Sequence, residues 1–157
     1  MADKTHLIEQ LTAVHRATET RIADLAPDLV IHADSGWRLH DIIGHIAVWY
    51  GVRVQALRAW QQGETFVLPG IDLQAVGGYN QVAFGKRRAW TYAAILADWQ
   101  QSFNDLIAEV EAIDPAKLDA EMTYPWNAPG TVGYLIERMI THAQEHLDEI
   151  QQAAAGS

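Results

Sequence analysis

The sequence has no cysteine among its 157 residues. This absence excludes disulfides, thiolate catalysis and cysteine-ligated metals, and we expect a cytoplasmic protein. Basic residues are also scarce, because 11 Lys and Arg stand against 20 Asp and Glu, for a net charge of −9. We therefore expect no nucleic acid partner, since binding phosphates requires clustered Lys and Arg, and no anionic membrane surface. No apolar run is long enough to span a bilayer, and the first residues lack the apolar core of a secretory signal.

Apolar residues instead recur at spacings of three and four, which predicts amphipathic helices. Four such segments cover roughly 4–26, 38–61, 91–113 and 132–152. We see no convincing strand. The sequence therefore predicts an all-α four-helix bundle in a single domain, 1–157, with long connections after the second and third helices. These connections leave the up-or-down order of the helices open.

The last predicted helix carries two histidines, His142 and His146, four residues apart. Residues at this spacing share one face, so their imidazoles can converge on one metal ion. His45 is the best third ligand, because it lies on a helix that is apolar on most sides and a buried imidazole needs partners. Glu149 is either an exposed charge or a carboxylate that orients one of the rings. The competing interpretation is ordinary helix histidines, one exposed and one hydrogen-bonded.

The same stretch matches the His-x-x-Glu-His pattern of inverted zinc proteases. We interpret the match as accidental, because Glu145 points away from the apolar face and only 11 residues follow His146 to supply the further ligand. Among the other histidines, three have no paired spacing and one, His40, is expected to face solvent. The three without paired spacing are His6, His15 and His32.

Aromatic and amide side chains could line a pocket beside these histidines. Trp126 lies in a proline-flanked loop before the last helix and is the best candidate for a ligand-binding lid. Asn80, next to Tyr79, lies in a segment at 72–88 that is either a short helix or irregular, because glycines weaken a helix there. For Trp49 and Trp60 we prefer packing in the core.

Two segments, 37–49 and 130–146, resemble the second and last helices of the DinB-like superfamily. The resemblance implies a four-helix bundle that is often a homodimer. It also implies a divalent metal, nickel or zinc, bound at the positions of His45, His142 and His146.

Relatives within this superfamily include thiol-dependent transferases, maleylpyruvate isomerases and colibactin self-resistance proteins. The resemblance implies a metal-dependent enzyme that acts on a small-molecule substrate by hydrolysis, or by thiol-dependent transfer or isomerisation. Any thiol would be a low-molecular-weight cofactor, because the chain has no cysteine. The self-resistance branch implies the alternative, a metal-free protein that binds a small molecule. The substrate is not apparent from the sequence.

Overall fold

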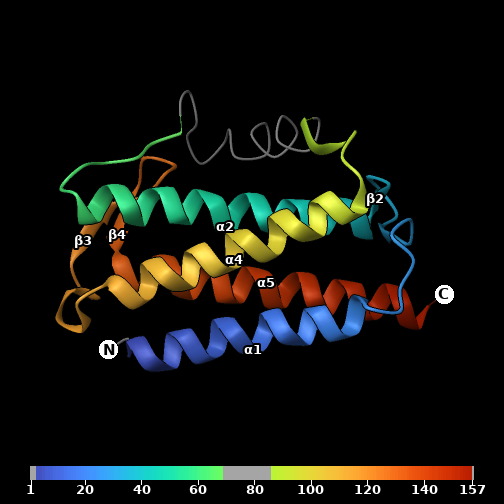
Figure 1. The fold of residues 1–157 in the computed structure, drawn as a ribbon, viewed down its shortest axis with the longest axis horizontal. Coiled ribbons are helices and arrows are strands. Elements are labelled where there is room, and N and C mark those ends of the chain that lie inside the picture. The colour runs from blue at the N-terminus through green and yellow to red at the C-terminus, as the bar shows by residue number, and fades with distance from the viewer. Residues whose placement is uncertain (1–2, 69–85, 157) are drawn as a thin grey trace.

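The computed structural model describes residues 3–68 and 86–156, which contain four long helices (Figure 1). These helices confirm the predicted four-helix bundle and lie within a few residues of the predicted ranges. They are α1 (Lys4–Ile22), α2 (Leu39–Gln61), α4 (Tyr92–Ala112) and α5 (Val132–Ala155). Tyr79, Asn80 and nearly all of the segment at 72–88 lie outside the described residues.

Local side-chain contacts explain where the helices begin. The Asp3 carboxylate accepts a hydrogen bond from the Thr5 amide at 3.1 Å, and Thr131 Oγ1 accepts one from the Tyr134 amide at 3.2 Å. Both are N-caps that satisfy backbone donors left free at a helix start. Helix α1 ends at Ile22 rather than near residue 26.

The helices do not alternate in direction. In Figure 1, α1 and α5 run one way, whereas α2 and α4 run the other way side by side. The end of α2 and the start of α4 therefore lie at opposite ends of the bundle, whereas α4 ends and α5 begins at the same end. The up-or-down order that the sequence left open is thus settled: the first long connection joins two helices that run in the same direction, and the second joins two that run in opposite directions.

Two short hairpins close opposite ends of the bundle (Figure 1). Strands β1 (Val30–His32) and β2 (Trp37–Arg38) precede α2, and a 3₁₀ turn (Pro115–Lys117) leads to β3 (Glu121–Thr123) and β4 (Pro129–Thr131). Each pair is antiparallel. The expectation of no strand was wrong, because segments of two or three residues are too short to show the alternating pattern of a strand.

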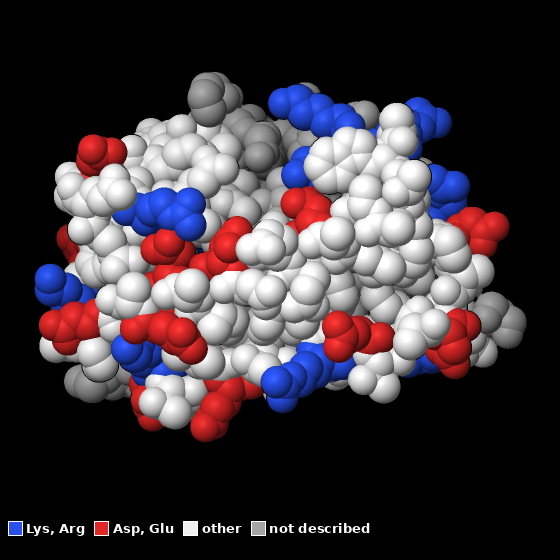
Figure 2. Space-filling view, viewed as in Figure 1, with Lys and Arg blue, Asp and Glu red and all other residues white. Residues whose placement is uncertain are grey.

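Helix α2 is the centre of the core and packs against both α4 and α5. It is buried on almost every side, as its apolar sequence predicts. On the face seen in Figure 2, acidic and basic side chains are interspersed. Among the described residues, no helix combines the length and apolar character needed to cross a bilayer.

Candidate metal centre

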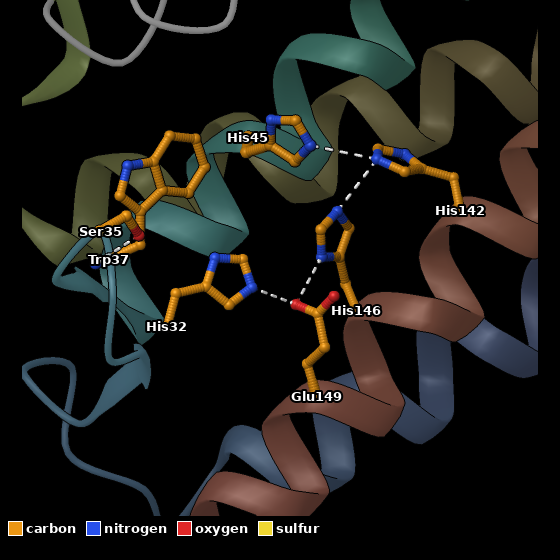
Figure 3. A network of polar contacts seen from close by, with 7 residues as sticks. All are labelled: His32, Ser35, Trp37, His45, His142, His146 and Glu149. Atoms are coloured by element: carbon orange, nitrogen blue, oxygen red, sulfur yellow. Dashed lines mark hydrogen bonds and ion pairs between the residues drawn. The ribbon is translucent and has the colours of Figure 1, made fainter. Parts of the chain in front are cut away.

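Three histidine side chains from two helices meet between α2 and α5 (Figure 3). His45 projects from α2, while His142 and His146 project from successive turns of α5. The Nε2 atom of His142 lies 3.1 Å from Nε2 of His45 and 2.9 Å from Nε2 of His146. One nitrogen from each ring lies within 4.8 Å of the other two. The predicted meeting of these imidazoles is therefore confirmed, whereas their binding of a metal stays a prediction.

The surroundings of the cluster favour neutral rings. Burial, and to a smaller extent the neighbouring histidines, lower the pKa of His45 to about 3 and that of His142 to about 2. Burial also lowers the pKa of His146, although Glu149 acts against this. All three are therefore neutral near pH 7, the state in which imidazole nitrogen binds a metal.

The protons on the ring nitrogens cannot satisfy all the contacts within the cluster. The ring of His146 uses Nδ1 to contact Glu149 at 3.2 Å, so its neutral tautomer carries the proton there and presents a lone pair at Nε2. Nε2 of His142 faces that lone pair and His45 Nε2 together. With a single proton or a single lone pair, it cannot make a good hydrogen bond to both neighbours.

A shared cation removes this conflict, because it accepts all the lone pairs at once. Metal–nitrogen bonds of about 2.0–2.1 Å place neighbouring ligands about 3–3.4 Å apart. Two of the three separations, 3.1 and 2.9 Å, come close to that spacing, and the third lies within 4.8 Å. An all-imidazole set suits zinc, nickel, copper or iron. The residues present therefore fit a divalent transition metal.

A carboxylate lies behind the cluster and links it to the first hairpin (Figure 3). Oε2 of Glu149 contacts His146 Nδ1 and also lies 2.5 Å from His32 Nε2. Burial alone raises the pKa of Glu149, but the His32 hydrogen bond and His146 outweigh it and lower the pKa overall. Glu149 is thus an ionised acceptor that fixes the His146 ring, as ligating histidines usually require.

His32 is a site residue that the sequence analysis missed. It lies on β1, 117 residues from Glu149, and reaches the carboxylate only because the hairpin folds over the end of α5. Trp37 on β2 contacts both His32 and His45. Its ring is 6.2 Å from that of His32 and meets that of His45 edge-on at 5.5 Å.

The cluster opens into a pocket of about 580 Å³, a volume typical of small-molecule sites. Its walls include Trp49, Arg53 and Trp126. Trp126 lies in the β3–β4 loop, with its ring 6.3 Å from that of Trp49. Trp49 is thus both a buried core residue, as expected, and a wall of the pocket.

Gly130 is required for the part of the pocket wall that Trp126 forms. A Cβ atom at that position would overlap the Tyr124 ring, which packs across Gly130 and lies 5.3 Å from the Trp126 ring. The hairpin can therefore hold Trp126 over the pocket only with glycine at this point.

Two other sequence expectations have different outcomes. Glu145 is exposed and takes no part in the hydrogen bonds and ion pairs of the three histidines, in accord with an accidental protease pattern. His40, expected to face solvent, is half-buried with its ring 5.9 Å from that of Tyr92. That expectation was wrong because the hairpin and α4 cover the first turn of α2.

The fold and site thus define a four-helix bundle with a three-histidine pocket. The sequence profile of the DinB superfamily matches residues 10–150, and the chain belongs to that superfamily. None of the curated proteins matches the sequence significantly.

Solved structures of the same fold cover nearly the whole chain. An uncharacterised protein from Escherichia coli UTI89 superposes with a TM-score of 0.84 at 14% identity, covering 99% of this chain and 95% of its own. The sibling lethal factor precursor DfsB gives 0.84 at 11% identity, covering 99% and 97%. At such low sequence identities, these superpositions show a shared fold and nothing about function.

The colibactin self-resistance protein ClbS, solved in complex with double-stranded DNA, gives a TM-score of 0.76 at 17% identity and covers 97% of both chains. This finding corrects the expectation that nucleic acid is excluded as a partner. Net charge alone does not exclude such a partner, because it sums over the whole surface and does not show how charge is distributed on one face.

Proposed function

We propose that this protein is a divalent-metal-dependent enzyme that acts on a small molecule at the three-histidine site. The observation that carries the proposal is the Nε2 atom of His142, which lies 3.1 and 2.9 Å from two other Nε2 atoms and cannot satisfy both as a neutral ring. Membership of the DinB superfamily supports it. Nickel and zinc are the metals that we expect first.

Three neutral nitrogens leave coordination positions open, so a bound metal supplies Lewis acidity towards the pocket. The protein side chains have separate tasks. Glu149 holds the proton at Nδ1 of His146 and thereby keeps Nε2 directed at the cluster. Trp49 and Trp126 provide apolar walls that exclude water from one side of a bound substrate. These features suit hydrolysis or thiol-dependent transfer or isomerisation, with a low-molecular-weight thiol as the second reactant.

Elemental analysis of protein purified without an affinity tag tests the proposal. We expect about one nickel, zinc or iron per chain, lost in His142→Ala and retained in His6→Ala. His6 is a matched control, because it is an exposed histidine on α1. Metal-free wild type, with a melting temperature unchanged by added metal, would contradict the metal assignment. A panel of thiols and electrophiles on metal-loaded protein then separates transfer from hydrolysis.

The second candidate is a metal-free protein that binds or disarms a small toxic molecule, as the self-resistance branch suggests. The observation that favours it is the likeness in fold to ClbS and DfsB, with TM-scores of 0.76 and 0.84. In that case the imidazoles donate and accept hydrogen bonds to the ligand. Ligand binding that is unaffected by chelator, in protein without metal, would support this candidate over the first.

Two broader expectations belong to the same proposal. We expect a cytoplasmic protein and a homodimer, the assembly that the superfamily resemblance implies. Sedimentation equilibrium over a tenfold range of concentration tests the second expectation, and a monomer throughout contradicts it.

A further inference from the structure

One arginine on the pocket wall is unusual in its burial. Arg53, on α2, is only 5% exposed, although arginine is almost never fully buried unless it is paired. Its Nε donates to the Leu135 carbonyl at 3.0 Å and its Nη1 lies 3.5 Å from the Trp49 carbonyl. The first contact joins α2 to α5 and the second stays within α2, and neither brings a negative charge to the guanidinium.

Other arginines in the described ranges show the contrast. Arg58, one turn further along α2, pairs with Glu109 at 2.8 Å, and Arg87 pairs with Asp98 at 3.4 Å. Both are more exposed than Arg53. Within residues 3–68 and 86–156, no carboxylate forms an ion pair with Arg53. A buried charge without a counter-ion destabilises the folded protein, so the position of Arg53 calls for a compensating anion.

The surroundings of Arg53 show where such an anion would lie. Arg53 lines the same pocket as the three histidines, and its Cζ is 5.8 Å from the centre of the Trp126 ring. Arg138 lies on the rim of this pocket and is close enough to lower the pKa of Arg53 and of His142. Burial and Arg138 lower the pKa of Arg53 to about 9, so it stays protonated at neutral pH. Among the described residues that line the pocket, the one carboxylate is that of Glu145, which is exposed and does not pair with Arg53.

We infer that the pocket selects a small organic anion, with Arg53 binding its carboxylate or phosphate group, Arg138 assisting at the rim and Trp126 packing on its apolar body. The inference rests on the proposed function, because the same molecule would present its reacting group to the histidines. A guanidinium suits both anions, because its fork of donors matches two oxygens. A buried Arg53 fits a small molecule better than duplex DNA, whose phosphates remain on the surface of the helix.

Binding of matched probes tests the inference on chelator-treated protein, so that no metal can hold the anion. Calorimetry compares 3-phenylpropionate and phenyl phosphate with the uncharged 3-phenylpropionamide. We expect at least one anion to bind about tenfold or more tightly than the amide, with a dissociation constant in the millimolar range or below. Which anion binds tighter identifies the preferred group. Equal binding of anions and amide, or no binding of either anion, overturns the inference.

Variants separate recognition from folding. Arg53→Met should remove the preference for the anion, Arg53→Lys should keep part of it, and Arg58→Met should leave it unchanged. Arg58 is the matched control, because it is on the same helix and lies outside the pocket. A preference that persists in folded Arg53→Met contradicts the inference. If Arg53→Met does not fold, Arg53→Lys decides, because unchanged anion affinity there contradicts a role for the guanidinium.

The outcomes also separate this inference from the proposed function. Metal-free protein with an Arg53-dependent preference for the anion supports the inference and contradicts the metal proposal. One metal ion per chain with equal binding of anion and amide supports the metal proposal and contradicts the inference. A short DNA duplex serves as a further arm, and Arg53-dependent binding of the duplex without binding of the small anions overturns the assignment to small molecules.

Discussion

The bundle buries histidines in two regions, and the comparison shows what distinguishes a structural imidazole from a candidate ligand. His15, on α1, is 3% exposed, and each ring nitrogen has its own protein partner. Its Nε2 lies 3.0 Å from Gln100 Oε1 and its Nδ1 lies 3.5 Å from the Tyr50 hydroxyl. The ring also stacks on Phe103 at 3.8 Å.

In the cluster of His45, His142 and His146, His146 is buried and the other two rings are half-buried, and the pattern of contacts is the opposite. Its nitrogens face one another at 2.9 and 3.1 Å, beside a pocket of about 580 Å³. Burial lowers the pKa of the rings in both regions. Burial therefore does not identify the site; the difference lies in which nitrogens lack a suitable protein partner.

The largest expected effect follows from removing a ligand. His142→Ala should reduce bound metal from about one ion per chain to less than about a tenth, because the two remaining nitrogens hold a metal poorly. His15→Gln, measured in the same elemental analysis, should retain full occupancy. Loss of metal in both variants would show that the two regions do not differ as described.

Removal of the His15 ring tests whether the region around it has a purely structural role. His15→Ala should lower the free energy of unfolding by about 3 kcal/mol, because it removes a stacked ring and leaves Gln100 and Tyr50 without their partner. Urea denaturation measures this loss. Metal content should not change, and a loss of metal in the folded variant would contradict a purely structural role.

Sequence reasoning found the parts of the site that local periodicity encodes. His142 and His146 follow from a spacing of four on one helix, and His45 from its place on a helix that is apolar on nearly every side. The contact between His32 and Glu149 spans 117 residues and depends on a hairpin with strands of two and three residues. No local pattern encodes such a contact. Arg53 was missed as well, because sequence does not show which charged residues of a central helix lack a partner.

Glu149 tests how far the cluster depends on its support. Glu149→Gln should weaken metal affinity by about 10- to 100-fold, because the amide orients His146 less firmly and stabilises its basic tautomer less. Competition with a chromogenic chelator measures the change. Asp148→Asn is the matched control, since Asp148 is the neighbouring, exposed acid on α5 and should leave affinity unchanged. Equal affinities in the two variants would contradict the role of Glu149.

Acid sensitivity of the chelator-treated protein tests whether the rings of the cluster are neutral in the folded state. The pKa of His45 is lowered to about 3 and that of His142 to about 2 in the folded protein, whereas unfolded imidazoles titrate near pH 6.5. Between these limits the unfolded chain binds protons that the folded chain does not. Stability is therefore complete above about pH 6.5 and falls on acidification, by up to about 1.4 kcal/mol per pH unit for each ring.

Urea denaturation at several pH values between 7.5 and 5 measures this slope. His142→Ala should show a shallower fall than wild type, because one depressed ring is gone. His6→Ala should match wild type, because that ring is exposed on α1. Identical slopes for wild type and His142→Ala would contradict the assignment of His142 as a buried, neutral ring.

The most direct test is an anomalous difference map from crystals of untagged protein, recorded at the absorption edge of the metal that elemental analysis finds. We predict one peak between α2 and α5, about 2.0–2.2 Å from the Nε2 atoms of His45, His142 and His146, and no peak beside His15. A map without a peak at the three imidazoles, in protein that contains metal, would contradict the account.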